Sequence, residues 1–240
     1  MLKIENVEVV GWEAAIRGMR NPKNSWVKSD SHWDYVNQGP EYLTVANFDD
    51  ADFNIGPNDK KLMSTLRNAG TDHRKFMRMI TVYLDITAPL YWWKEFDTYK
   101  VGTVANSCST MHKIAAKEFT LEDFSCEHLC DDELELLKEI ITRLNMNRIV
   151  FIAKDDKRVD RYSVMSDECY AKYKKKLWWQ MIQLLPSSYN QKRTVMLNYE
   201  VLANIYKSRR NHKLDEWRTF CHWIESLPYS TLITGGVVDE

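Results

Sequence analysis

The chain has 240 residues, of which 44% are hydrophobic and 12% are aromatic. This length and composition permit one large domain or two small ones with a packed core, and they exclude an intrinsically disordered protein. The 33 basic and 34 acidic residues nearly cancel, so the net charge does not favour nucleic acid as a partner. No apolar run approaches the roughly 20 residues that a membrane-spanning helix requires, and the first residues do not form a secretory signal. We therefore expect a cytoplasmic protein without membrane or nucleic-acid partners.

The N-terminal part of the sequence predicts two helices joined by a long loop. Residues 7 to 19 have the pattern of a short strand that leads into a helix, which ends before Pro22. A polar segment rich in tryptophan and tyrosine follows from residue 23 to 53, and its composition is that of a loop. Pro57 then begins a second helix, which Gly70 ends.

The most informative stretch begins with a predicted strand over residues 77 to 86, where β-branched and aromatic side chains dominate. Pro89 suits the first turn of a helix, because its missing N–H would be unpaired there in any case. An aromatic-rich helix follows, and residues 106 to 109 then offer amide, hydroxyl and thiol groups in consecutive positions. These groups either contact a ligand or hydrogen-bond their own backbone in a turn.

The five cysteines are few and odd in number, which indicates reduced thiols rather than disulfides. Cys126, His128 and Cys130 are close in sequence and are possible zinc ligands. Their spacing differs from that of common zinc sites, and no second Cys or His pair completes a set of four ligands. We therefore expect no metal site.

The second half of the sequence predicts helices around one further strand. Leu134, Leu137 and Ile141 belong to a three- and four-residue apolar repeat typical of a helix, and residues 148 to 153 could extend that helix or form a strand. The remaining elements are a helix over 162–185, a strand over 193–197, a helix over 198–212, a helix through 217–224, and a loose end after Gly235.

Two groups of residues resemble the flavin-dependent thymidylate synthases, also called thymidylate-synthase-complementing proteins. The resemblance is strongest over residues 73 to 112 and 178 to 220. Members carry a His shortly before a strand that leads to Ala-Pro, an order and spacing that match His73, Ala88 and Pro89. Members also carry Leu-Pro followed at fixed distances by Asn, Asn and Arg, which correspond to Leu185, Pro186, Asn198, Asn204 and Arg209.

The signature motif of this family, Arg-His-Arg-x-x-Ser-x-Asn-Glu-x-Ser-x-Arg, is altered in this chain. Its Arg-His-Arg triplet falls on residues 98 to 100, where only Lys100 keeps the charge. With a one-residue insertion, Asn106, Ser107 and Ser109 take the places of the Asn, Glu and Ser. Without it, Asn106 replaces the Glu and Cys108 the Ser. Two further family arginines fall on residues 182 and 200, which are Ile and Glu here.

The resemblance implies an α/β (α+β) fold in which a curved, mainly antiparallel sheet is flanked by helices. It implies one domain over residues 1–230, a flexible tail over residues 231–240, and a homotetramer with sites shared between subunits. The family reaction is the reductive methylation of dUMP to dTMP, with FAD as cofactor and methylenetetrahydrofolate and NADPH as co-substrates. In such chemistry the protein mainly positions the reactants and stabilises charge.

The resemblance also implies roles for seven residues of this chain. A pyrimidine nucleotide would contact Lys100, Ser107, Ser109 and Arg209. The flavin would contact His73, Asn198 and Asn204. Two other hypotheses stay open: a homologue that binds a nucleotide or flavin but has lost catalysis, and a ligand-free structural or interaction protein.

Overall fold

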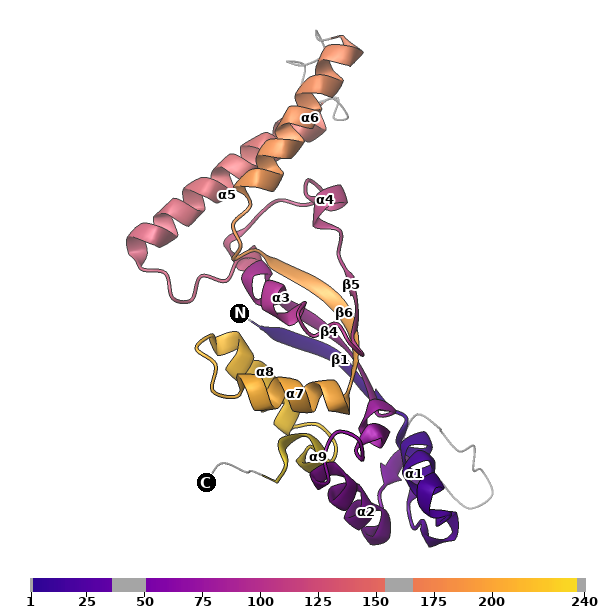
Figure 1. Cartoon of the computed structure of the whole chain (residues 1–240). Helices are drawn as coiled ribbons and strands as arrows, with labels where there is room; N and C mark the ends of the chain where they lie inside the picture. Colours follow the sequence, from indigo (N-terminus) through magenta and orange to yellow (C-terminus); the bar gives the residue numbers. More distant parts are fainter. Residues whose placement is uncertain (1, 36–50, 154–165, 237–240) are drawn as a thin grey trace, which may run out of the picture. The chain divides into compact units, whose positions relative to one another are not determined.

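A computed structural model describes residues 2–35, 51–153 and 166–236. Its main sheet has four strands in the order β1 (Lys3–Val10), β4 (Thr81–Pro89), β6 (Asn190–Asn198) and β5 (Val104–Ser107), which lie side by side in Figure 1. A second, two-stranded antiparallel sheet pairs β2 (His32–Tyr35) with β3 (Ala51–Asn54). The structure confirms the predicted α+β class with a mainly antiparallel sheet.

The described residues also form α-helices and short 3-10 helices. In chain order, the α-helices are α1 (Trp12–Arg20), α2 (Pro57–Asn68), α3 (Leu90–Phe96), α4 (Thr110–Lys113), α5 (Asp131–Ile152), α6 (Asp167–Leu184), α7 (Tyr199–Arg209), α8 (Asp215–Glu225) and α9 (Thr231–Thr234). The 3-10 helices are η1 (Asn21–Lys23), η2 (Trp26–Lys28), η4 (Lys75–Arg78) and η5 (Leu121–Asp123). Residues 148 to 152 extend α5, so the helical alternative for that stretch is the correct one.

Several elements differ from the sequence-based predictions. The segment from residue 23 to 53, predicted as a loop, includes η2, β2 and part of β3 among its described residues. The strand predicted from residue 77 begins at Thr81, because the preceding residues form η4, where Phe76 and Met77 are buried. Pro89 ends β4 and caps α3 rather than lying within its first turn. At the C-terminal end, residues 231 to 234 of the expected tail form α9, with buried Leu232 and Ile233; residues 237–240 lie outside the described part.

The chain divides into two compact units whose segments alternate along the sequence. Unit 1 comprises the described residues of Met1–Glu5, Asp85–Thr98 and Ala105–Thr194. Unit 2 comprises those of Asn6–Leu84, Tyr99–Val104 and Val195–Glu240.

The core of unit 1 forms where α5 and α6 pack against each other. Leu137, Ile141 and Leu144 of α5 are buried in one cluster with Met181 of α6, and this spacing is the apolar repeat of the sequence. The segment before α5 joins the same cluster through Ile114, Phe119 and Phe124. Ser125 N also donates to the carbonyl of Ser188, just before β6, at 2.9 Å. This hydrogen bond holds the segment next to the start of β6.

The core of unit 2 is centred on Tyr199, the first residue of α7, which is fully buried. Its ring meets Trp12 edge to face with centroids 5.3 Å apart, and its hydroxyl donates to the Pro228 carbonyl at 2.6 Å. Burial raises the pKa of Tyr199 far above its ordinary value, so the phenol stays protonated and keeps this donor. Trp217 of α8 is also fully buried in this unit.

A buried ion pair joins α1 and α2 in unit 2. Arg20 Nε lies 2.6 Å from Asp59 Oδ1, and neither side chain is more than 4% exposed. The other carboxylate oxygen, Oδ2, accepts from both the N–H and the hydroxyl of Ser31 and from the hydroxyl of Ser29, at 2.7–3.2 Å. Asp59 thereby holds the segment between α1 and β2 in place. A buried charge network of this kind stabilises the fold when each of its donors is paired.

Replacing Asp59 by Asn should lower the free energy of unfolding by about 3–5 kcal/mol, because the buried Arg20 guanidinium loses its counter-charge. Urea denaturation monitored by tryptophan fluorescence measures this loss. Asp72→Asn, at an exposed position of the same unit, should change the free energy by less than about 0.5 kcal/mol. Equal effects of the two substitutions would contradict the role given to Asp59.

The same carboxylate makes stability depend on acid. Burial raises the pKa of Asp59, but hydrogen bonds from Ser31, Ser29 and Arg20 outweigh this and hold the pKa below its ordinary value. The stabilisation is therefore complete above the unfolded pKa of about 3.9 and is lost as the pH falls through the folded value. In urea titrations below about pH 4, the wild-type protein should lose its stability advantage over Asp59→Asn.

Candidate functional site

The segment from Ser107 to Thr110, which the sequence marked as polar, is held along β6 in unit 1. Cys108 N donates to the Lys192 carbonyl at 3.0 Å. The Gln191 side-chain amide donates to the Cys108 carbonyl at 3.1 Å and to Thr110 Oγ1 at 2.9 Å. Residues 106 and 107 belong to β5, so only part of the segment forms the turn considered from the sequence. Both cavities of unit 1 that are described below border this segment.

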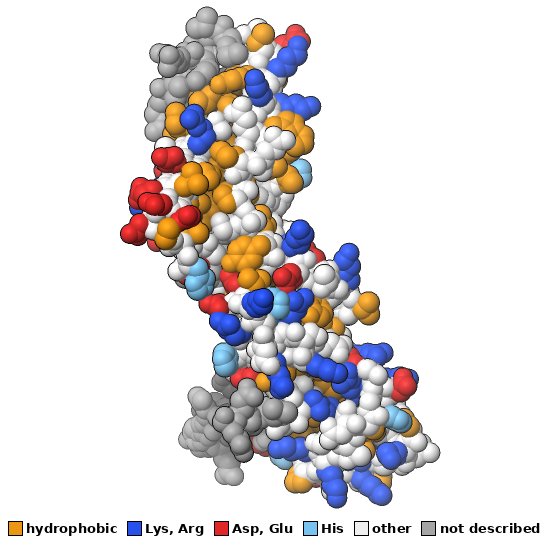
Figure 2. All heavy atoms as spheres, turned by 60° about the vertical axis from the view of Figure 1, so that its left-hand side comes forward, with side chains coloured by type: hydrophobic (Ala, Val, Ile, Leu, Met, Phe, Trp, Pro, Cys, Tyr) orange, Lys and Arg blue, Asp and Glu red, His pale blue; other side chains and the backbone are white. Residues whose placement is uncertain are grey.

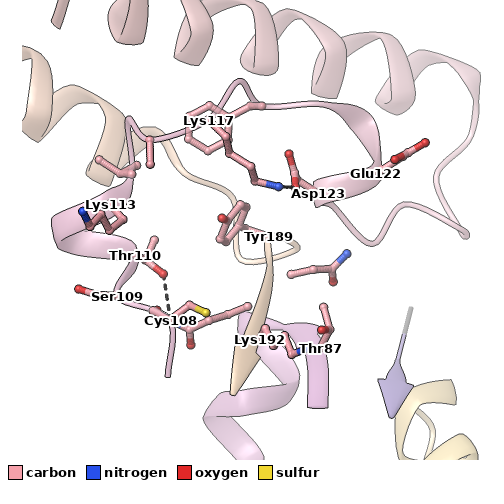
Figure 3. A pocket seen from close by; sticks show the side chains of 15 residues that line it. Thr87, Cys108, Ser109, Thr110, Lys113, Lys117, Glu122, Asp123, Tyr189 and Lys192 are labelled. Atoms are coloured by element: carbon pink, nitrogen blue, oxygen red, sulfur yellow. Dashed lines mark hydrogen bonds and ion pairs between the residues drawn. The ribbon is translucent and has the colours of Figure 1, made fainter. Parts of the chain in front are cut away.

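The first of these, the lysine cavity, has a volume of about 370 Å³ and is shown in Figure 3. Lys117 forms an ion pair with Asp123, and Lys192 Nζ lies 3.1 Å from an Asp85 carboxylate oxygen. Hydrogen bonds to these carboxylates raise the pKa of both lysines. Burial, followed by the charge of Asp123, raises the pKa of Tyr189 between them. Because Glu122 and Asp123 also line this cavity, it is poorly suited to a phosphate.

The second, the arginine cavity, has a volume of about 400 Å³, which is within the usual range for small-molecule sites. Ser107, Ser109 and Thr110 contribute hydroxyl groups, and Arg193 contributes a guanidinium. Leu90, Met111, Ile182 and Leu185 form apolar walls. Among the described residues that line it, Arg193 is the one charged side chain and no carboxylate occurs. This combination of apolar walls, hydroxyls and one cation suits an anionic ligand with a flat apolar part.

Three contacts hold the Arg193 guanidinium in place. It lies over the Trp93 ring, 4.1 Å from the ring centroid. Its Nε donates to the Gln191 side chain at 3.0 Å, and one Nη donates to Asp97 at 2.7 Å. Trp93 itself donates from its ring N–H to the Gln191 carbonyl at 2.9 Å. Gln191 therefore links Arg193 to the Ser107–Thr110 segment.

Of the residues predicted to bind the nucleotide, Ser107 and Ser109 lie together in the arginine cavity of unit 1. Lys100 and Arg209 lie in unit 2. Lys100 is exposed. Arg209 donates from Nε to the Tyr99 hydroxyl at 2.9 Å and lies 4.8 Å from the centroid of the Trp217 ring.

The residues predicted to bind the flavin all lie in unit 2. Asn198 caps α7, because its side-chain oxygen accepts from Val201 N at 3.1 Å; this is a structural role that its sequence position left open. Gly102, with a φ of 79°, approaches the Asn198 amide so closely that a Cβ would lie 2.8 Å from Nδ2. Only glycine tolerates both that φ and that contact. His73 is exposed.

Asn204 borders a third cavity, the basic cavity of unit 2, which has a volume of about 250 Å³. Its lining contains four cationic side chains, Arg67, Arg74, Lys207 and Arg210. Arg74 Nη2 donates to the Asn204 side chain at 3.4 Å, and its Nε lies 2.8 Å from Glu200 Oε2. Arg74 Nε and Glu200 Oε2 are buried and too poorly aligned to form a hydrogen bond with each other. Burial, and then the charge of Arg74, lowers the pKa of Arg67, so the cavity favours an anion.

Sequence reasoning missed Gln191, Arg193 and Arg74. The first two lie two positions apart on β6, so they share a face of the strand, and this alternation was the available signal. Arg74 follows His73 directly, but nothing in the sequence indicates that it reaches α7. Within the described ranges, no group of three or more His, Cys, Asp or Glu side chains could hold a metal ion. No helix of the described part is long and apolar enough to cross a membrane.

Comparisons with known proteins give a structural match only. No protein-family model matches the sequence, and no curated protein matches it. Two solved structures of the flavin-dependent thymidylate synthase of Helicobacter pylori (thymidylate synthase X), with FAD and dUMP, are similar to the chain. Their TM-scores are 0.59 and 0.60, with 14% identity, and each match covers 97% of this chain and 98% of the other. The likeness establishes the fold over nearly the whole chain.

Proposed function

We propose that this protein is a flavin-dependent thymidylate synthase-like enzyme that acts on a pyrimidine nucleotide, with dUMP as the first candidate. The reaction would be the reductive methylation of dUMP to dTMP, with methylenetetrahydrofolate and NADPH as co-substrates. The observation that supports this most is the likeness of almost the whole chain to a thymidylate synthase solved with FAD and dUMP. The arginine cavity adds a site of suitable size and chemistry next to Ser107 and Ser109.

FAD suits the residues that unit 2 offers. Its diphosphate is anionic, and the basic cavity presents several cations and the Asn204 amide. Asn204, Lys207 and Arg210 are exposed and accessible to a ligand. His73, beside Arg74, and Asn198, beside Gly102, would flank the rest of the cofactor. When bound, FAD supplies the hydride chemistry that such a reaction needs.

The chain's own residues would bind and orient the nucleotide. Ser107 and Ser109 would donate hydrogen bonds, and the apolar walls of the arginine cavity would exclude water from the base. The family resemblance also implies Arg209, whose contact with Trp217 holds the guanidinium in one place. Lys100, as a flexible point charge, would attract the nucleotide rather than fix its geometry.

The second candidate is a homologue that binds a nucleotide or flavin without catalysis. It is favoured by Ile182, which forms part of the arginine cavity at a position where the family resemblance implies an arginine. Binding of FAD and dUMP without formation of dTMP would support this candidate over the enzyme.

The purified protein should take up FAD and keep the visible flavin absorption band after the excess is removed. With FAD bound, it should convert dUMP to dTMP in the presence of methylenetetrahydrofolate and NADPH. The double variant Lys207→Gln/Arg210→Gln should bind FAD about tenfold more weakly or worse, because it removes two cations near the diphosphate. Arg17→Gln, at an exposed position of the same unit, is the control. A protein that takes up no FAD would overturn the proposed function.

Replacing Arg209 by Ala should weaken dUMP binding by about 1.5–3 kcal/mol, the range for a hydrogen bond to a charged group. Calorimetric titration with dUMP measures the change. Tyr99→Phe removes only the hydroxyl that Arg209 Nε donates to and should have a smaller effect. Melting curves of both variants separate binding from folding, and unchanged affinity in a folded Arg209→Ala protein would remove Arg209 from the site.

We further propose a homotetramer, because α5 and α6 carry large apolar side chains that unit 1 leaves exposed. Figure 2 shows hydrophobic side chains gathered over these helices. Leu136, Met146 and Ile149 of α5 and Trp179 of α6 are 46–56% exposed. Exposed apolar side chains that gather on one part of a surface mark protein interfaces.

Sedimentation should therefore give a particle of four times the chain mass. Leu136→Glu/Ile149→Glu should shift it towards smaller species, because charges would be buried in the interface. Thr142→Glu, on the same helix and also exposed, is the control and should leave the tetramer intact. A monomeric wild-type protein would exclude sites shared between subunits.

A further inference from the structure

We propose that Arg193 is the phosphate-binding residue of the arginine cavity, and that it binds the 5′-phosphate of a nucleoside monophosphate. This inference deepens the proposed function and rests on it. Arg193 lies outside the signature motif, and the family resemblance gives it no role.

The Arg193 side chain is positioned before any ligand binds. It is 15% exposed, its face rests on Trp93, and its Nε is directed to Gln191. A guanidinium has five N–H donors, of which the contacts to Gln191 and Asp97 use two. The remaining donors suit the two oxygens of a phosphate, which a guanidinium binds in a bidentate manner.

The hydroxyls of the same cavity are arranged to donate. Ser109 Oγ accepts from His112 N at 3.3 Å, and Thr110 Oγ1 accepts from the Gln191 amide at 2.9 Å. A hydroxyl that already accepts a hydrogen bond still has its own O–H to give. Both O–H groups therefore favour a ligand that only accepts hydrogen bonds, as a phosphate does.

Charge distinguishes this cavity from its neighbour. The lysine cavity also contains cations, but the carboxylates of Glu122 and Asp123 line it as well. Among the described residues lining the arginine cavity there is no acidic side chain. Its apolar side, with Leu90 and Ile182, would receive the base.

Asp97 is the group that competes with a phosphate for Arg193. It lies 2.7 Å from Nη1 and its side chain is 50% exposed, so water reaches the pair and lowers the cost of sharing the cation. Removing the Asp97 charge should therefore tighten phosphate binding, whereas a purely structural Arg193 would gain nothing from that change. This opposite response separates a binding role from a structural one.

The test is calorimetric titration of the full chain with dUMP, deoxyuridine and inorganic phosphate. Arg193→Gln should weaken dUMP binding by about 10- to 100-fold and leave deoxyuridine binding unchanged, because only the phosphate contact is lost. Arg193→Lys should lose less, since it keeps the charge without the planar fork. Asp97→Asn should tighten dUMP binding, and Arg143→Gln, an exposed arginine of the same unit, should change nothing. Melting curves confirm that each variant is folded.

The outcomes separate this inference from the proposed function. If the wild-type protein binds dUMP and folded Arg193→Gln and Arg193→Lys bind it equally well, the role of Arg193 is wrong while the nucleotide site stands. If inorganic phosphate binds in an Arg193-dependent manner and dUMP does not bind, the anion site stands and the nucleotide function is wrong. If neither dUMP nor phosphate binds, both are wrong.

Discussion

The hydrogen bonds of β6 are the constraint on which the rest of the candidate site depends. This strand lies between β4 and β5 in the sheet, and its Gln191 and Lys192 hold the polar segment at Cys108. The Gln191 carbonyl also receives the Trp93 ring N–H. A strand paired on both sides has little freedom, so side chains that it carries are held to narrow positions. Arg193 is one of them.

Two positions at which the family resemblance implies an arginine lie near a guanidinium from another part of the chain. The family resemblance implies arginines at residues 182 and 200, where this chain has Ile and Glu. In unit 1, Ile182 borders the same cavity as Arg193. In unit 2, Glu200 faces Arg74 at 2.8 Å. Arg193 and Arg74 each lie outside the helix that carries the altered position.

The three cavities differ in electrostatics more than in size. Carboxylates neutralise most of the lysine cavity. The basic cavity concentrates cations, and there burial, followed by the charge of Arg74, lowers the pKa of Arg67. The arginine cavity combines one cation with hydroxyls and apolar walls. The hydroxyls and apolar walls of the arginine cavity suit the nucleotide proposed above. The four cationic side chains of the basic cavity suit the proposed diphosphate.

The sequence by itself determined the helices and strands wherever the apolar period was clear, as in α5, where Leu137, Ile141 and Leu144 repeat on one face. It also singled out residues 106 to 109, because a run of small polar residues is poor core material. It could not find Arg193, whose partners Trp93 and Asp97 lie about a hundred positions away. It could not show that Asn198 caps α7 or that residues before Thr81 leave the strand. Period and composition are local properties, whereas pairing between distant segments is decided only when the chain packs.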